Sequence, residues 1–482
     1  MNFSFSNLGA IKATEMELRP LTIIIGPNNS NKTYIAYTVY GLLHELLSSR
    51  IGVPVASSGI DSKKAPSNYN WHDKLKSELS LYQRRAESWF ARNLGTFFQD
   101  SSDRLFSGTS VKVSFSETEF QDALKNLSKI KAIKSLRGTI NLSLSNSDIH
   151  IHTDDSLSFG PLRLRDVLIR LLNSTNNFIY PKPFLLPAER NAFVITYKML
   201  ANRRYKFLRE TQRGLFGKSS NKQRRQLELL REQGDIRYPQ PVEDFLDFLT
   251  DVELESEKEY KSKKRQDFIN LADYIELNIQ NNNKTNWKVT ELGGREIKVS
   301  INKELEIDLY NASSSIKQIS PLLLYLRYRA QENDLLIIDE PEMNLHPESQ
   351  AKLLEALAIL VNLGVKVLLT THSPYFMAHL NNLVSGNVTN KSALKRQAEA
   401  LYLKDTHAFL PLDSVSAYEM KAYKNEFKLN DLKDKDYGIR WDTLSDVSAE
   451  IQQKFFQIHE KGKAPSRATK KKKTSKQAKP KV

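Results

Sequence analysis

The segment from Leu21 to Leu47 constrains the fold more than any other part of the chain, because a strand, a glycine-containing loop and a helix follow one another directly. Leu21 to Ile25 is an apolar run that predicts a buried strand. After Lys32, apolar residues recur at helical spacing and predict a buried helix. A buried strand that leads directly into a helix is typical of α/β proteins, so we predict that fold class.

The loop between this strand and helix reads GPNNSNKT and follows the Walker A pattern of phosphate-binding loops. Such loops need glycine because main-chain N–H groups must wrap around the phosphates, and side chains would block that approach. Lys32 would reach the β and γ phosphates of ATP, and Thr33 would bind Mg²⁺. The candidate ATP-binding residues are Gly26, Asn28, Asn29, Ser30, Asn31, Lys32 and Thr33.

Asn31 stands where the Walker A pattern has its second glycine. That glycine typically takes a left-handed or otherwise permissive backbone conformation. Asparagine is among the residues that visit this conformation at the lowest cost. We therefore predict that the loop still forms.

The stretch DLLIIDEPEMNLHPESQ predicts a short buried strand that ends in Asp339 and Glu340. Two carboxylates at the end of such a strand suit a Walker B site. Asp339 would hold Mg²⁺ through water, and Glu340 would polarise the attacking water. The structural alternative is that the acidic residues cap the helix beginning near Pro347.

Two further segments carry candidate site residues. VKVLLTTHSPYF predicts a second buried strand, Val365 to Thr371, followed by His372, which could sense the γ phosphate and help to position water. A lone histidine of this kind can equally be structural. In YNASSSIKQIS, a cluster of hydroxyl side chains precedes a helix, and Ser313 and Ser314 could bind the phosphate of a second subunit's nucleotide.

Composition and charge narrow the class of protein. The chain has no cysteine, no signal peptide and no run of about 18 apolar residues, so we expect a cytoplasmic protein without membrane contact. Of the net charge of +15, the last 22 residues supply +10. This tail should be a disordered arm that either contacts nucleic acid or keeps the protein soluble.

The chain is long enough for a main domain with a substantial insertion. We predict an N-terminal half of the main domain and then a long helical insertion. The N-terminal half has an antiparallel layer between about Val111 and Thr153, a helix near Arg163 to Leu172 and a strand, PFLLPAER, that ends at Arg190. The insertion carries a basic block and an acidic block, which either neutralise each other in a helical hairpin or leave a basic helix free to track DNA. The predicted boundaries are residues 1–190, 191–283, 284–460 and the tail 461–482.

Taken in order, the four motifs resemble those of the ABC-type ATPases of the SMC, RecF and OLD group, and most closely the stand-alone OLD-type AAA ATPases, whose motifs read GPNNSGKT, SSGIKQ, IIDEPEMNLHP and TTHSPYF. The resemblance implies an ATPase head with a mixed central sheet, an antiparallel β layer and a coiled-coil-like insertion. It also implies a head-to-head homodimer, or a higher even oligomer, that sandwiches two ATP molecules with Mg²⁺. Ser313 or Ser314 would contact the opposite γ phosphate, Asn344 would lie at the dimer seam, and His372 would be the switch histidine.

This chain departs from the family pattern at Asn31 and at Ser315, which replaces the signature glycine, so we expect slow turnover. The segment PAER, where the family often has a glutamine loop, makes Glu189 and Arg190 candidates for coupling the insertion to the nucleotide. The structural alternative is that Arg190 pairs with a carboxylate at a strand end.

Residues 385–460 are too few for the nuclease domain that many OLD proteins carry. The pattern therefore resembles the ATPase subunits of two-component phage-defence systems such as PARIS and Septu, in which a separate protein carries the toxic activity. This resemblance implies an ATPase that acts as sensor and scaffold for a nuclease effector. The alternatives are a RecF- or SMC-like DNA-repair ATPase, and a clamp that binds ATP with little turnover.

Overall fold

The computed structural model divides by its contacts into two compact units, Met1–Ile439 and Arg440–Val482. It describes residues 1–48, 71–100, 102, 104–121, 132–135, 138–145, 148–153, 180–199, 238–250, 263–289, 295–386, 391–424, 426–434, 438–440 and 453–454. The predicted helix near residues 163–172, most of the predicted insertion (200–237 and 251–262) and the basic tail 461–482 lie outside these residues. No helix of the described part is long and apolar enough to cross a membrane.

A six-stranded mixed sheet forms the centre of the first unit, in the order β15-β14-β3-β13-β12-β8. Five of its strands are parallel, and the edge strand β15 runs antiparallel to β14. The bounds are β3 Leu21–Ile25, β8 Pro183–Leu186, β12 Leu335–Asp339, β13 Lys366–Thr371, β14 Val415–Tyr423 and β15 Glu426–Asp431. Every residue of β3, β8 and β12 is buried, as expected for parallel strands covered on both faces. The α/β fold with a mixed central sheet is therefore confirmed.

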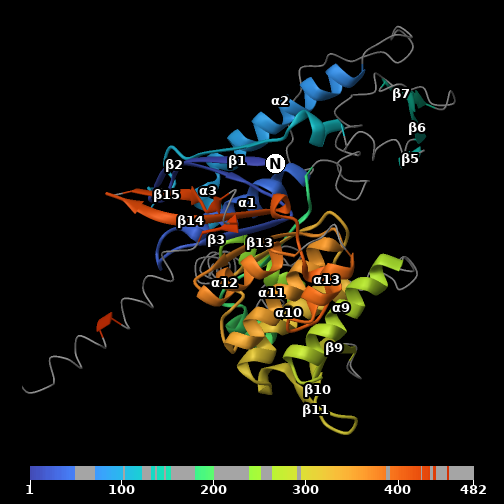
Figure 1. Ribbon diagram of the computed structural model, residues 1–482. Helices are drawn as coiled ribbons and strands as arrows, with labels where there is room; N and C mark the ends of the chain where they lie inside the picture. The colour runs from blue at the N-terminus through green and yellow to red at the C-terminus, as the bar shows by residue number, and fades with distance from the viewer. Residues whose placement is uncertain are drawn as a thin grey trace, which may run out of the picture. The chain divides into compact units, whose positions relative to one another are not determined.

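Helices cover both faces of this sheet (Figure 1). The helix α1 contacts β8, β12 and β13, whereas α11 contacts β13, α9 and α12. The bounds are α1 Lys32–Leu47, α10 Ser314–Tyr328, α11 Pro347–Asn362 and α12 Pro374–Val384. Proline occupies the first turn of both α11 and α12, where its missing N–H costs nothing, and the side chains of His346 and Ser373 cap these two helices.

The N-terminal strands form a separate antiparallel sheet in the order β2-β1-β4, with bounds β1 Asn2–Leu8, β2 Ile11–Glu17 and β4 Ser110–Ser114. A second antiparallel sheet, β5-β6-β7, comprises Ala132–Ser135, Gly138–Ser145 and Asp148–Thr153. The strands between Val111 and Thr153 are therefore antiparallel, as predicted, but they belong to two different sheets. The first of these strands, β4, pairs with β1, more than 100 residues earlier, instead of with its neighbours in the sequence.

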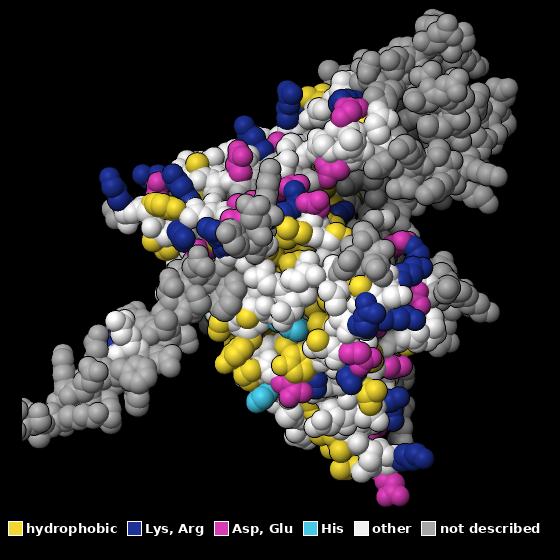
Figure 2. Space-filling view, in the orientation of Figure 1, with side chains coloured by type: hydrophobic (Ala, Val, Ile, Leu, Met, Phe, Trp, Pro, Cys, Tyr) yellow, Lys and Arg dark blue, Asp and Glu magenta, His cyan; other side chains and the backbone are white. Residues whose placement is uncertain are grey.

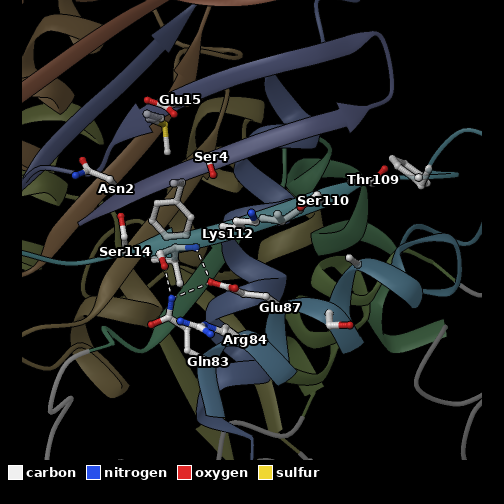
Figure 3. A pocket seen from close by; sticks show the side chains of 18 of the residues that line it. Asn2, Ser4, Glu15, Gln83, Arg84, Glu87, Thr109, Ser110, Lys112 and Ser114 are labelled. Carbon is white, nitrogen blue, oxygen red and sulfur yellow. Dashed lines mark hydrogen bonds between the residues drawn. The ribbon is translucent and has the colours of Figure 1, made fainter. Parts of the chain in front are cut away.

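Side chains of α2 (Trp71–Arg92) close the outer edge of β4. The Val113 N–H donates to Glu87 Oε1 at 2.9 Å, and Gln83 Nε2 donates to the Val113 carbonyl (Figure 3). Satisfying an edge strand in this way removes a site of unwanted strand pairing. The polar groove of about 1190 Å³ beside this edge is lined by residues of β1, β2, β4 and α2, and not by the Walker A loop.

Two helices from the range predicted as an insertion pack on the main domain. The helix α8 (Gln240–Thr250) contacts α1 and β8, and Tyr40 Oη donates to Asp244 Oδ2 at 2.6 Å. The helix α9 (Lys263–Ile279) contacts α10 and α11. After α9 the chain forms the antiparallel sheet β11-β10-β9, with bounds β9 Lys284–Val289, β10 Arg295–Ser300 and β11 Glu306–Asp308. The strand β9 begins at the predicted boundary, residue 284.

A buried ion-pair network joins α10 to α9 and β9. Arg327 donates to both carboxylate oxygens of Glu276, at 2.7 and 2.6 Å, and to Asp273 at 2.6 Å. It also donates to the carbonyl oxygen of Thr285 at 2.6 Å. Because both Glu276 and Arg327 are buried, breaking this network would leave an unpaired charge in the interior. The helix α10 is therefore firmly anchored at its C-terminal end.

The remaining described elements are shorter or peripheral: α3 Leu94–Phe98, α13 Lys391–Ala398, β16 Lys433–Asp434, β17 Gly438–Ile439, and the 3-10 helices Leu309–Asn311, Thr406–Ala408 and Leu412–Ser414. On the face drawn in Figure 2, basic side chains are interspersed with acidic ones over the described residues. The two basic blocks that prompted the DNA-binding predictions lie almost wholly outside this part of the chain.

We predict that Asp334→Asn stabilises the protein at neutral pH. Asp334 accepts hydrogen bonds from Tyr325 Oη at 3.1 Å and from the Gln331 N–H at 3.0 Å, and burial raises its pKa to about 6. The folded state therefore binds more protons than the unfolded state between the ordinary pKa of 3.8 and about 6, so stability falls as the pH rises through this window. The variant lacks this loss, and its melting temperature should exceed that of the wild type by ~2 °C at pH 7.5 but not at pH 4.5.

Thermal melts at the two pH values measure this difference. The control is Asp413→Asn, which removes an exposed carboxylate whose pKa Lys433 lowers, and which should not raise the melting temperature. Equal changes in melting temperature for Asp334→Asn at both pH values would contradict the prediction.

Candidate nucleotide site

The register of the central sheet brings the sequence motifs to one edge. Thr371 of β13 lies opposite Ile25 of β3, and Asp339 of β12 lies opposite Thr370 of β13. Because these strands are parallel, the residues that follow them meet at their carboxyl ends, where α/β sheets bind ligands. The Walker A loop, the Walker B carboxylates and His372 therefore lie side by side, with β13 between the two Walker strands.

The backbone of the Walker A loop requires a small residue at its first position. Gly26 has a φ of 152°, and a Cβ atom there would lie 2.8 Å from Met420 Cβ. Asn31 has φ 67° and ψ 19°, the left-handed conformation predicted from the sequence. Although Asn31 is the N-cap residue of α1, its side chain makes no capping hydrogen bond. The side chain of Asn31 thus does not occupy the N–H groups of the first turn of α1, which are the groups that bind anions.

Lys32 is buried inside the loop that precedes it. Its Nζ donates to the carbonyl oxygens of Gly26 at 3.0 Å and Pro27 at 2.8 Å, and to Ser30 Oγ at 3.4 Å. Burial lowers its pKa to about 8, although the nearby carboxylates Glu340, Asp339 and Glu342 favour the charged form. A polyanion bound in the loop would favour the ammonium form further.

Asp339 is almost fully buried beside the start of α1. Its carboxylate accepts hydrogen bonds from Thr33 Oγ1, at 3.1 Å from Oδ2, and from Thr370 Oγ1. Burial raises its pKa to about 6 despite these two hydrogen bonds. Mg²⁺ is usually held by one or two protein oxygens together with phosphate oxygens and water, so Thr33 and Asp339 fit such an ion. Thr370 was not predicted, because no residue pattern marks it.

Glu340 and His372 face each other at 3.2 Å, between Glu340 Oε1 and His372 Nε2. This contact lowers the pKa of Glu340, so its carboxylate is ionised at neutral pH. Glu340 has a φ of 48°, which is unusual for a residue other than glycine or asparagine. The sequence reasoning missed Glu342, whose Oε1 accepts the His372 N–H at 2.6 Å and thereby holds the residue after β13 in place.

Arg190 corrects two predictions. The strand β8 ends at Leu186, and residues 190–199 are helical, so Arg190 does not lie at a strand end. Among the residues that the structure describes, its guanidinium also makes no ion pair with a carboxylate. It donates to the main-chain carbonyl oxygens of Asp339 at 2.8 Å and Glu340 at 3.1 Å. Burial lowers its pKa to about 10.

The serine cluster lies at the exposed start of α10. Ser313 caps this helix by accepting the Ile316 N–H at 3.3 Å, and its Oγ lies 3.0 Å from Ser315 Oγ. Ser313 and Ser314 are exposed, as is Asn344. Within the described residues, no hydrogen bond links this cluster to the Walker A loop of the same chain. The structure therefore brings together the Walker motifs and His372, but not the serines.

We predict that Asn31→Ala destabilises the protein by about 1 kcal/mol, because alanine tolerates the left-handed conformation poorly. Asn31→Gly should leave the free energy of unfolding within about 0.5 kcal/mol of the wild type, because glycine adopts this conformation freely but loses more entropy on folding. Chemical denaturation monitored by fluorescence measures both values. Equal stability of the two variants would show that the conformation at Asn31 costs nothing.

Comparison with known proteins identifies the family. The AAA ATPase domain family matches residues 1–377, a range that includes the Walker A loop, the serine cluster, both carboxylates and His372. No curated protein matches the sequence.

Three solved structures of Smc heads are similar at low levels. An Smc head bound to the C-terminal winged-helix domain of ScpA has a TM-score of 0.38 and 10% identity, with 89% of this chain and 97% of that one covered. The Smc head of Pyrococcus furiosus, with an extended coiled coil and bound to the C-terminal domain of ScpA, has a TM-score of 0.38 and 10% identity, covering 94% and 98%. The SMC head domain of Thermotoga maritima has a TM-score of 0.32 and 9% identity, covering 90% and 98%. By the match over residues 1–377, this chain belongs to the AAA ATPase domain family.

Proposed function

We propose that this protein is a Mg²⁺-dependent ATPase whose head binds ATP in the loop from Gly26 to Thr33. One observation carries the proposal. The Thr33 hydroxyl lies 3.1 Å from the Asp339 carboxylate although the two residues are 306 positions apart, and the Lys32 ammonium lies against the preceding loop. This combination supports one site for a triphosphate and its metal ion.

In this proposal the loop binds phosphate through the main-chain N–H groups around Asn28, Asn29, Ser30 and Asn31. Lys32 would exchange its bonds to the loop carbonyl oxygens for bonds to the β and γ phosphates. Thr33 and Asp339 would hold Mg²⁺, which when bound would neutralise part of the phosphate charge. The bound ion would lower the pKa of Asp339 again, because a cation favours the carboxylate.

Glu340 is the proposed base for hydrolysis. It is half-buried and next to the Walker B aspartate, and its contact with His372 favours the ionised form at neutral pH. A carboxylate in this position would orient a water molecule for attack and accept its proton. His372 would keep Glu340 directed towards the γ phosphate and sense its presence.

We also propose that a second copy of the chain completes the site. Ser313 and Ser314 are exposed and lie at the start of a 15-residue helix, whose N-terminal N–H groups favour an anion. Since they make no hydrogen bond to their own Walker A loop among the described residues, the phosphate they would contact is that of a partner. Two heads would then enclose two ATP molecules.

At the biological level we propose a cytoplasmic sensor and scaffold of bacterial phage defence that controls a separate nuclease. The support is the resemblance of GPNNSNKT, SSSIKQ, IIDEPEMNLHP and TTHSPYF to the motifs of OLD-type ATPases. Family membership supports the ATPase activity alone.

Glu340→Gln should lower kcat for ATP hydrolysis by about 100-fold or more while leaving the Kd for ATP nearly unchanged, because it removes the base and keeps the shape. Phosphate release and fluorescent-nucleotide binding measure the two quantities. Glu332→Gln, which changes a surface glutamate before the amino end of β12, the end opposite to Glu340, is the control. Equal and negligible turnover in the wild type and Glu340→Gln would instead favour an ATP-bound clamp, and absence of ATP binding would refute the proposal.

Ser313→Arg should abolish ATP-dependent dimerisation, because a large cationic side chain would replace a small hydroxyl group at the proposed seam. Glu340→Gln with ATP should accumulate the dimer. The control, Ser88→Arg, places the same side chain on the exposed face of α2. Mass photometry with and without ATP reads out the assembly. Dimerisation of Ser313→Arg at the wild-type level would contradict the proposed seam.

Purification with the products of neighbouring genes tests the defence role. A nuclease effector should co-purify with the wild type, and its activity should depend on ATP turnover by the head. Deleting residues 461–482 distinguishes the alternative role in DNA repair. Loss of a salt-dependent DNA affinity on deletion, without any effector, would favour the repair ATPase.

A further inference from the structure

Arg190 is buried to 2% exposure and has no role in the mechanism proposed above. A buried arginine normally pairs with a carboxylate, because an isolated charge in the interior is costly. Within the described part of the chain, the hydrogen bonds of Arg190 go to carbonyl oxygens. Charge pairing therefore does not explain why an arginine is buried at this position.

The guanidinium uses all of its donors. Nε donates to the Gln318 main-chain oxygen at 3.1 Å, and Nη1 donates to the main-chain oxygens of Pro187 and Asp339, both at 2.8 Å. Nη2 donates to the Glu340 main-chain oxygen at 3.1 Å. With the Gln318 amide oriented so that its oxygen faces the guanidinium, that oxygen accepts from Nη2 at 2.6 Å. A guanidinium has five N–H groups, and each then has an acceptor.

These acceptors belong to three separate segments. Pro187 follows β8 and precedes the helical residues 190–199. Gln318 lies in the second turn of α10, close after the serine cluster. Asp339 and Glu340 are the Walker B residues themselves. Arg190 is thus a rigid connection between the start of the predicted insertion, the helix that carries Ser313, and the proposed catalytic strand end.

We infer that Arg190 is a positioning residue, which couples the backbone conformation of Glu340 to the position of α10. The inference rests on the proposed function. Glu340 holds an uncommon left-handed conformation, which persists only where surrounding contacts enforce it, and the bond from Arg190 to its carbonyl oxygen is such a contact. A shift of α10 when a partner engages Ser313 would move Gln318, and through Arg190 it would move the carbonyl oxygens of Asp339 and Glu340.

In this arrangement ATP hydrolysis depends on Arg190, whereas ATP binding does not depend on it. No hydrogen bond described for Arg190 reaches residues 26–33, which carry the proposed phosphate contacts. Lysine cannot replace the planar guanidinium group of arginine, because its ammonium group carries three donors on one atom and has no fixed plane. The effect of Arg190→Lys should therefore appear in kcat and not in the Kd for ATP.

The test compares Arg190→Lys with Arg327→Lys, a matched change at another buried arginine, which lies within α10 and makes no described bond to Asp339 or Glu340. Arg190→Lys should lower kcat about 100-fold, with the Kd for ATP within about threefold of the wild type, as expected when a reacting group is displaced by about 1 Å. Arg327→Lys should lower the melting temperature but change kcat per folded molecule less than about threefold. The double variant Arg190→Lys with Ser313→Ala should be no slower than the slower single variant, because both act through one connection.

Gln318→Ala supplies a second measurement should Arg190→Lys fail to fold. It removes one acceptor and leaves the main-chain oxygen, so kcat should fall by about 5- to 10-fold without a change in ATP affinity. Wild-type kcat in Arg190→Lys, or equal losses of kcat, ATP affinity and stability in Arg190→Lys and Arg327→Lys, would overturn the inference. If Arg190→Lys does not fold, a wild-type kcat in Gln318→Ala would overturn the inference. Failure of the wild type itself to hydrolyse ATP would instead refute the proposed function.

Discussion

The hydrogen bond from Thr33 to Asp339 is the interaction on which the rest of the site depends. It joins the first turn of α1 to the end of β12 across the intervening strand β13, and it can form only if the parallel register holds. The strands that lead to it are shielded from water, since every residue of β3 and β12 is buried. A carboxylate in such surroundings is destabilising unless it is paired, which is why the pKa of Asp339 rises to about 6.

Burial shifts the two central charged groups in opposite directions. It lowers the pKa of Lys32 to about 8 and raises that of Asp339 to about 6, so both are pushed towards their neutral forms. At neutral pH both groups are still mostly charged, and a triphosphate beside Lys32 and a divalent cation beside Asp339 would each stabilise the charged form further. Nucleotide and metal would therefore each offset part of the cost of burying these two charges.

Local sequence patterns sufficed for the elements that carry the Walker motifs. The strand β3 and the starts of α1 and α11 agree with prediction because contiguous apolar runs, helical periodicity and proline at a helix start act over a few residues. The partner of β4, the end of β8 and the bonds of Arg190 were not predictable in this way. Each depends on residues more than 100 positions away, and main-chain carbonyl oxygens leave no trace in residue identity. Glu342 and Thr370 lie within two residues of Glu340 and His372, but they were missed because no residue pattern marks their contacts with His372 and Asp339.

The two departures from the family's glycine pattern have different physical consequences. At Asn31 the left-handed backbone is retained and the side chain does not cap α1, so the substitution leaves the anion-binding N–H groups of the first turn available. At Ser315 the hydroxyl lies 3.0 Å from Ser313 Oγ, so it engages the very side chain proposed to reach a partner's phosphate. Contact with that phosphate would have to compete with the bond between the two serines. Any slowing of turnover in this chain is therefore expected to arise where the second copy closes on the site, and not where the nucleotide is first bound.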